Sequence, residues 1–291
     1  MVNPIAHGSL LGLLLVGCTA PPSAPERVAA PRVFTLAYPT TFLAEAIAGT
    51  DFRVVDVRPD HDDPEAWVPT SENTFTIQED APVLLVGAGF ETWYRPENFS
   101  SVLTVRLADA LGAGVVTRPS GKVDPFFWLE PESLALAGQA VADRLAQLRP
   151  DLEARLRERQ KALATRLAQL EKSLRERSRD LPPLFAAREG YAYAARALGW
   201  KLQTLAVDPV AAPSPEARAR WRERRQAHPA SVLLFDRAPS QEVREALEAD
   251  GLTPVVFPLL TRLPPEARGA GQSYFEVYAA AVERVRSAVS L

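Results

Sequence analysis

The sequence predicts an α/β fold of two lobes with mainly parallel sheets and a long helix between them. Three observations support this prediction. Strand-like and helical segments alternate in the first part of the chain, and the alternation resumes after Pro182 and Pro183. Between these parts, residues 151–180 contain neither Gly nor Pro. Alternating strands and helices are typical of parallel sheets, and a long stretch without helix breakers is typical of one continuous helix.

The N-terminal lobe is predicted over residues 32–148. Its strand-like segments are rich in β-branched residues, and one is continuously apolar, as buried parallel strands are. These segments are "RVFTLAYP", "FRVVDVRP", "APVLLVGAG" and "VLTVRLAD". Helices are predicted for "TTFLAEAIAG", which ends at Gly49, and for residues 132–148, which Pro150 terminates.

The connection over residues 149–180 is predicted to be a linking helix. Its leucines recur at spacings of three, four and seven residues, which places them on one face of a helix: Leu152, Leu156, Leu163, Leu167, Leu170 and Leu174. Arg and Glu occupy the other faces. The stripe is short for a free coiled coil, so we expect the helix to pack along its own chain. A coiled-coil partner helix is the alternative.

The C-terminal lobe is predicted over residues 181–291. Its expected strands are "PLFAA", "KLQTLAV", "ASVLLFD" and "TPVVFP". Its expected helices are "EGYAYAARALG", "SPEARARWRERRQAH", "SQEVREALEADG" and "QSYFEVYAAAVERVRSAV". Ser214 and Pro215 suit the N-cap and first position of the second helix. The arginines of residues 218–225 are interpreted as a solvated helix face.

The N-terminus resembles a bacterial lipoprotein signal. The run "SLLGLLLVGC" is too short to span a membrane but has the length of a signal peptide's apolar region. Its end resembles the lipobox, so residues 1–18 are predicted to be a signal peptide and Cys18 the lipidated residue. A plain secretory signal with an incidental Cys is the alternative. Residues 19–31, rich in Pro and Ala, are predicted to be a flexible tether.

Composition and motifs argue against several classes of function. The net charge of −3 gives no basic balance for nucleic acid. The single Cys lies in the predicted signal, which leaves none for a disulfide or a Cys-based zinc site in the mature chain. No Gly-rich phosphate loop, G-x-S-x-G or H-E-x-x-H occurs, so no enzyme is expected. Gly87-Ala88-Gly89 lacks the third glycine of a dinucleotide fingerprint.

Four motifs, in order and spacing, resemble the zinc- and manganese-uptake solute-binding lipoproteins of ABC transporters. They are "YPTTFLAEAIAG", "DDPEAWVPT", "DPFFWLEP" and "REGYAYAARALG". The second resembles an Asp-Pro-His loop, the third an Asp-Pro-His-x-Trp-Leu-Asp-Pro loop and the fourth a His-x-x-x-x-Tyr…Gly helix start. The resemblance covers nearly the whole mature chain. It implies a rigid linking helix, a cleft between the lobes and a monomer that works with a permease.

The resemblance also implies a metal site of three His and one carboxylate, one from each of four loops. The matching positions here are Glu65, Phe126, Arg188 and Phe257. An Arg keeps its proton and repels a cation, and Phe has no atom that can serve as a metal ligand. The sequence therefore predicts a degenerate site, with neither zinc nor manganese as an expected cofactor.

Two further interpretations stay open for these positions. His61, Asp62, Asp63 and Glu65 offer donors for a divalent cation, although a solvated acidic loop is the simpler interpretation. Glu65 and Arg188 come from opposite lobes and are expected to form an ion pair across the cleft. Arg188 could instead hold a carboxylate or phosphate of an organic or chelate ligand, with phenyl rings against its apolar part.

The predicted function is an extracytoplasmic solute-binding lipoprotein of an ABC importer with a substituted binding site. Its lipid anchor would hold it to the bacterial membrane, on the periplasmic side or the cell surface. One alternative is a cargo-free scaffold or interaction lipoprotein that keeps the two-lobed fold. The other is a residual divalent-metal binder that uses Glu65 and its acidic neighbours.

Overall fold

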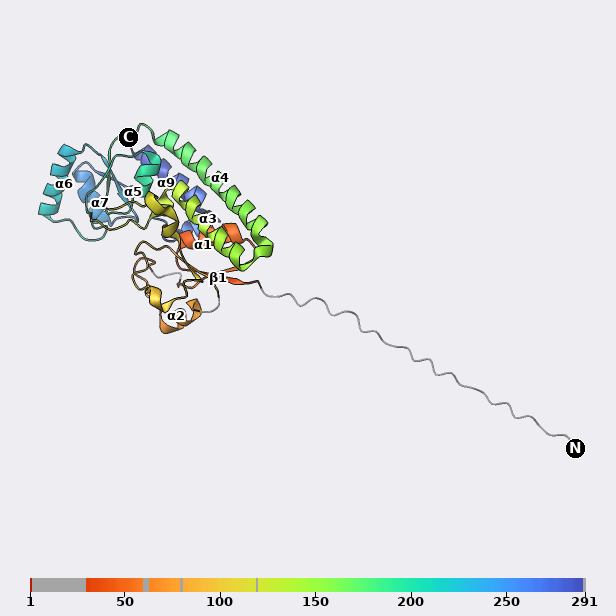
Figure 1. The fold of residues 1–291 in the computed structure, drawn as a ribbon. Coiled ribbons are helices and arrows are strands. Elements are labelled where there is room, and N and C mark those ends of the chain that lie inside the picture. Colours follow the sequence, from red (N-terminus) through yellow and green to blue (C-terminus); the bar gives the residue numbers. More distant parts are fainter. Residues whose placement is uncertain (2–29, 60–62, 79–80, 119, 290–291) are drawn as a thin grey trace.

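A computed structural model describes Met1 and residues 30–59, 63–78, 81–118 and 120–289. Cys18, the predicted signal and most of the tether lie outside these residues, as do His61 and Asp62. Two four-stranded parallel sheets form the two lobes, in the orders β2-β1-β3-β4 and β6-β5-β7-β8. The predicted two-lobed α/β fold is confirmed (Figure 1).

In the N-terminal lobe, β1 (Arg32–Thr35) pairs with β2 (Arg53–Asp56) and β3 (Val83–Leu85), and β3 pairs with β4 (Thr104–Arg106). Helices α1 (Tyr38–Ala48), α2 (Ser71–Ile77) and α3 (Pro131–Leu148) belong to this part of the chain. Short 3₁₀ segments are η1 (Pro96–Asn98), η2 (Leu107–Gly114) and η3 (Phe127–Leu129).

In the C-terminal lobe, β5 (Leu184–Ala186) pairs with β6 (Leu202–Thr204) and β7 (Val232–Phe235), and β7 pairs with β8 (Thr253–Val256). Its helices are α5 (Ala192–Leu198), α6 (Pro215–Ala227), α7 (Gln241–Ala249), α8 (Pro265–Gly269) and α9 (Tyr274–Val289). Ser214 caps α6 as predicted, since its Oγ accepts the N–H of Ala217.

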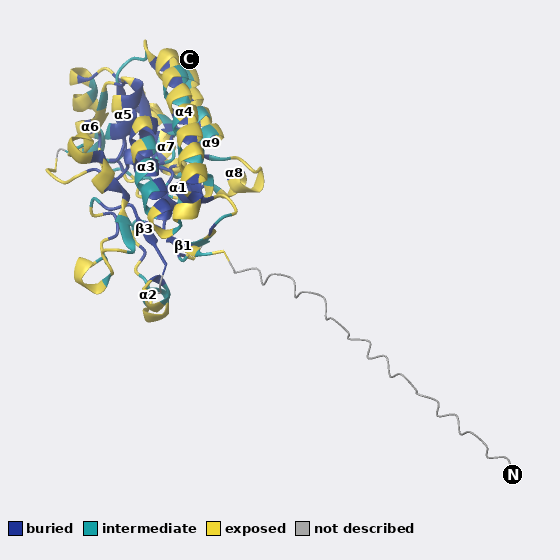
Figure 2. Cartoon of the chain, turned by 45° about the vertical axis from the view of Figure 1, so that its right-hand side comes forward, coloured by how far each residue is buried: buried dark blue, intermediate teal, exposed yellow. Residues whose placement is uncertain are grey.

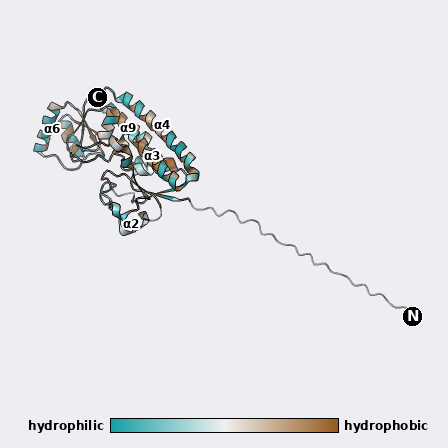
Figure 3. Cartoon of the chain, viewed as in Figure 1, coloured by the Kyte–Doolittle hydropathy of each residue, from teal (hydrophilic) through white to brown (hydrophobic). Residues whose placement is uncertain are grey.

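The linking helix is α4 (Glu153–Ser178), which follows the 3₁₀ turn η4 (Pro150–Leu152). It packs on α1 and α3 of the first lobe and on α5 and α9 of the second. Leu156, Leu163, Leu167 and Leu174 are buried, while its polar side faces solvent (Figures 2 and 3). The helix therefore packs along its own chain, as predicted, and bridges both lobes.

The turn η3 joins the lobes through its backbone and one indole. The Nε1 of Trp128 donates to the carbonyl of Leu259 at 2.6 Å. The hydroxyls of Tyr274 and Tyr278, both on α9, donate to the carbonyls of Trp128 and Leu129, each at 2.6 Å. All of these side chains are fully buried, so water competes little for the bonds. The aromatic centre of "DPFFWLEP" is thus buried between the lobes and hydrogen-bonded across them.

Three arginines of residues 218–225, interpreted from the sequence as a solvated helix face, also bond to Asp250 at the end of α7. Arg218 and Arg222 bond to the carboxylate of Asp250, which is 3% exposed as a side chain, and Arg225 donates to the carbonyl of the same residue. The Arg218 hydrogen bond lowers the pKa of Asp250, outweighing the opposing effect of burial. The cluster ties α6 to the end of α7.

No helix within the described residues is long and apolar enough to cross a membrane.

Candidate functional site

Glu65 is presented by a tight turn that follows β2. The carboxylate of Asp63 accepts the N–H of Glu65 at 3.1 Å, and the carbonyl of Asp63 accepts the N–H groups of Ala66 and Trp67. Trp67 is buried and packs edge-on against Trp93 at 5.9 Å. The acidic turn is therefore anchored on its own lobe, and one carboxylate oxygen of Asp63 is used as a hydrogen-bond acceptor within the turn.

Arg188 follows β5 and forms the expected ion pair with Glu65 across the lobes. Its Nη2 lies 2.6 Å from Oε2 of Glu65, and its Nη1 lies 3.2 Å from Oε1. The same Nη1 lies 3.2 Å from Oδ2 of Asp236. Burial opposes the charged form of Arg188, but the two carboxylates together raise its pKa. One guanidinium is thus held by a carboxylate from each lobe.

Asp236 was missing from the predicted site. It directly follows β7, which is the neighbour of β5 in the sheet. Because carboxyl ends of adjacent parallel strands meet at one sheet edge, the acidic residue at the end of "ASVLLFD" was the available signal. Glu65, Arg188 and Asp236 are called the ion triad below. Their side chains are 28%, 38% and 21% exposed, so all three are partly shielded from water.

Phe126 lies beneath the ion triad and is fully buried. The guanidinium carbons of Arg118 and Arg188 lie 5.3 and 5.7 Å from its ring centre. The ring also contacts Phe90 and Trp128 edge-on, at 6.3 and 5.3 Å. The phenyl ring therefore fills the space with apolar contacts and offers no donor to a metal.

Gly190 makes room for Phe126. A Cβ at position 190 would lie 2.8 Å from two carbons of the phenyl ring, and the backbone there has a φ of +124°. Both facts disfavour any other residue at this position. The ring of Phe126 and the glycine two residues after Arg188 therefore fit each other across the lobes.

Phe257 does not join the ion triad. It is fully buried, and its ring packs edge-on against Tyr191, Trp200 and Tyr278 at 5.5 to 5.9 Å. Val255, two residues earlier, is also buried, so Phe257 continues the inward face of β8. The structure places a core residue at the fourth predicted position and brings Asp236 to the site instead.

The described residues contain no group of three or more His, Cys, Asp or Glu side chains that could hold a metal ion. His228, the only His among them, is buried, and its Nε2 lies 3.1 Å from the carbonyl of Leu184. Zinc needs about four N, O or S donors. At the ion triad, two carboxylates surround a fixed positive charge, which does not fit a dication.

Comparison with known proteins identifies the family to which this two-lobed fold belongs. The family model described as zinc-uptake complex component A, periplasmic, matches residues 33–288. The chain belongs to this family. The resemblance in the sequence motifs is thereby confirmed, while no match is found among curated proteins.

Several solved structures share the fold of this chain. Zinc-bound AdcA of Streptococcus pneumoniae is 20% identical with a TM-score of 0.80; the match covers 90% of this chain and 58% of AdcA. The metal-dependent lipoprotein YcdH of Bacillus subtilis is 20% identical with a TM-score of 0.81, over 90% of this chain and 100% of YcdH. The periplasmic zinc-binding protein TroA of Treponema pallidum is 17% identical with a TM-score of 0.74, over 89% and 99%.

Proposed function

We propose that this chain is an extracytoplasmic solute-binding lipoprotein of an ABC importer, in which the ion triad replaces the metal site of its family. The observation that carries the proposal is the guanidinium of Arg188 held between Glu65 and Asp236. Family membership and the matching fold support the solute-binding role. In this role the protein would bind its solute without catalysing a reaction.

The charges of the ion triad argue against tight binding of a free divalent cation. Two unit charges about 4 Å apart in a partly buried site interact by about 4 kcal/mol at an effective dielectric of 20, and a dication doubles this. A metal ion bound by Glu65 and Asp236 would lie beside Arg188 and incur that repulsion. It would also have to take both carboxylates from the guanidinium.

The same bonds argue against Arg188 as a receptor for a ligand anion. Its Nη1 already serves two carboxylates, and its Nη2 serves Glu65. This engagement of the guanidinium by two carboxylates favours a second candidate, a cargo-free interaction lipoprotein that retains the two-lobed surface. A permease and an ATPase encoded beside the gene would favour the importer, and an isolated gene would favour the scaffold.

The proposed location and partners follow from the family and from the N-terminal sequence. Cys18 would carry the lipid anchor, residues 19–31 would act as the tether, and the permease would be the protein partner. The folded part of the chain would act as a monomer and would not bind nucleic acid. A single acyl chain binds membranes only marginally, so the multiply acylated form is required for stable anchoring.

Calorimetric titration of the EDTA-treated protein with zinc and with manganese tests the proposed site. We expect no single site with a submicromolar dissociation constant for either metal. Submicromolar binding that Glu65→Gln abolishes would overturn the proposal and restore the residual-metal interpretation. Glu72→Gln, which changes an exposed acidic residue on α2, is the matched control for a loss of negative charge.

A further inference from the structure

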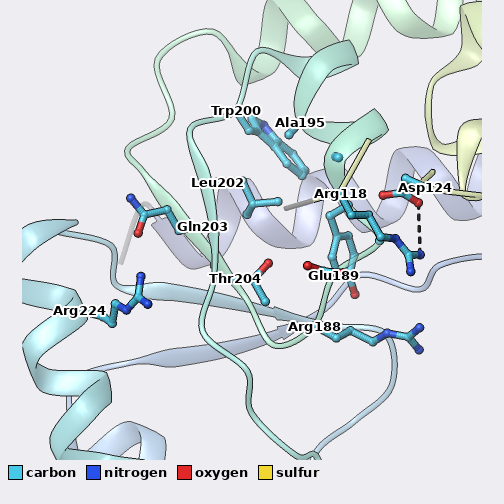
Figure 4. Close-up of a pocket in the computed structure, with 13 residues that line it drawn as sticks. Arg118, Asp124, Arg188, Glu189, Ala195, Trp200, Leu202, Gln203, Thr204 and Arg224 are labelled. Carbon is cyan, nitrogen blue, oxygen red and sulfur yellow. Dashed lines mark hydrogen bonds and ion pairs between the residues drawn. The ribbon is translucent and has the colours of Figure 1, made fainter. Parts of the chain in front are cut away.

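A separate cavity lies along the edge strand of the C-terminal sheet. Its volume is about 640 Å³, within the usual range of roughly 300–1,000 Å³ for small-molecule sites. Strand β6 and Trp200 provide one wall, Arg118 and Asp124 lie at one end, and Arg224 lies at the other (Figure 4). We call it the β6 cavity. It shares Arg188 with the ion triad, but that guanidinium is engaged by Glu65 and Asp236.

Two adjoining side chains at one end of the β6 cavity have unmet hydrogen-bonding capacity. The side chain of Asp124 is 0% exposed, and its Oδ2 has no hydrogen-bond partner among the described residues. Its Oδ1 accepts the N–H of Phe126 at 3.1 Å and lies 3.4 Å from Nη2 of Arg118. The Nε of Arg118 is also buried without a partner. Buried polar atoms are nearly always paired, so this end of the cavity holds one acceptor and one donor that lack their usual partners.

The charge at this end of the cavity is negative on balance. Glu189 lies close enough to Asp124 to oppose its ionisation, although burial is the larger cause of the raised Asp124 pKa. The only hydrogen bond found for the Glu189 carboxylate within the described part of the chain comes from Ser120 at 3.4 Å. Two carboxylates against the single guanidinium of Arg118 leave one net negative charge. This end suits a cationic group that donates hydrogen bonds.

The opposite end of the cavity is positive. Arg224 extends from α6 toward β6 in Figure 4, and its guanidinium forms no ion pair within the described residues. Between the two ends, Leu202, Trp200 and Ala195 form an apolar surface, and Gln203 and Thr204 add polar side chains beside it (Figure 4). The order of the surfaces is thus negative, partly apolar and positive.

From this order we infer that the β6 cavity binds a small zwitterionic organic solute. Its ammonium group lies against Glu189, its carboxylate against Arg224, and its apolar body on Trp200 and Leu202, while the buried Asp124 adds to the negative potential at the ammonium end. Amino acids with a long spacer and dipeptides have this chemistry. The inference does not depend on the fate of the family's metal site, because the groups that make these contacts lie outside the ion triad.

Three probes of matched length test the arrangement: 6-aminohexanoate, hexanoate and hexylamine. The first carries both charges, and each of the others carries one. Binding is measured by ligand-observed NMR or calorimetry on the purified protein. We expect 6-aminohexanoate to bind at least about tenfold more tightly than either singly charged probe. Equal binding of all three probes, or no binding of 6-aminohexanoate up to about 10 mM, would overturn the inference.

Two variants test which end of the β6 cavity binds the ammonium group and which end binds the carboxylate. Glu189→Gln should weaken 6-aminohexanoate and hexylamine but not hexanoate, whereas Arg224→Gln should weaken 6-aminohexanoate and hexanoate but not hexylamine. Arg220→Gln, an exposed arginine of the same helix outside the cavity, is the matched control. Thermal melts check that each variant folds. If neither Glu189→Gln nor Arg224→Gln changes binding, the assignment is wrong. Zinc titration of the same proteins reports on the ion triad separately, so each proposal can fail without the other.

Discussion

Replacing Arg188 by His should turn the ion triad into a site that binds zinc. In the native protein, Nη1 of Arg188 lies 3.2 Å from both Oε1 of Glu65 and Oδ2 of Asp236. The two carboxylates therefore flank one position. Arg188→His removes the fixed charge from that position and adds an imidazole donor. Three protein ligands with water as the fourth satisfy zinc in open sites.

The expected gain follows from the lost repulsion. A dication about 4 Å from a guanidinium is disfavoured by about 8 kcal/mol at an effective dielectric of 20. Solvent and side-chain movement reduce this penalty in a partly exposed site. If only a quarter of it is recovered, the gain is about 2 kcal/mol, which corresponds to roughly 30-fold in the dissociation constant. The new imidazole donor adds to this figure.

The assay is calorimetric zinc titration of the wild type and three variants of Arg188. Arg188→Lys keeps the charge and should bind as poorly as the wild type. Arg188→Gln removes the charge without adding an imidazole and should fall between the extremes. Arg220→His makes the same exchange at an exposed position of α6, outside the cavity that holds the ion triad, and should change little. Zinc affinity of Arg188→His no higher than that of Arg188→Lys would refute the electrostatic argument.

Three other predictions concern the anchor, the linking helix and a buried acid. Labelled fatty acid should enter the full-length protein and not Cys18→Ala; an intact precursor found soluble in the cytoplasm would contradict this. Leu167→Asp should destabilise by at least the ~2–5 kcal/mol typical of truncating a buried Leu, measured by urea unfolding, whereas exposed Gln169→Asp should not. Burial raises the pKa of Glu91 from 4.5 to about 7, against opposing hydrogen bonds from Gly87 and Val86. The folded state thus holds the proton more tightly than the unfolded chain, so stability should fall by up to roughly 3 kcal/mol as pH rises from 4.5 to 7. Glu91→Gln should lose that slope, and an unchanged slope would exclude Glu91 as its source.

The parts of the fold that depend on local sequence were predictable. The leucine spacing of residues 152–174 predicted both the linking helix and its buried face, because helical periodicity is a property of neighbouring residues. The N-cap at Ser214 was predictable for the same reason. The Glu65–Arg188 pair came from motif resemblance, which carries information about distant positions that periodicity lacks.

The missed features depend on residues that meet only after folding. Asp250 lies 25 or more positions from the arginines that surround it, so residues 218–225 looked solvated in isolation. Phe257 was placed by its distance from Pro258, but strand alternation turns its ring into the core. Asp236 lies at the end of a different strand and reaches Arg188 only because β7 and β5 are neighbours.

The residues at the proposed substituted site fit one another, and this fit bears on whether such a site would result from the loss of metal ligands alone. Loss of His ligands without further adjustment would leave a void or unpaired carboxylates, each of which costs free energy. Here the ring of Phe126 fills its space against Gly190, and Arg188 stacks above it while neutralising charge on Glu65 and Asp236. Because each change needs the others, the set is expected to hold the lobes in one arrangement. A protein fixed in this way would present a constant two-lobed surface to the proposed partner, with the β6 cavity open beside the triad.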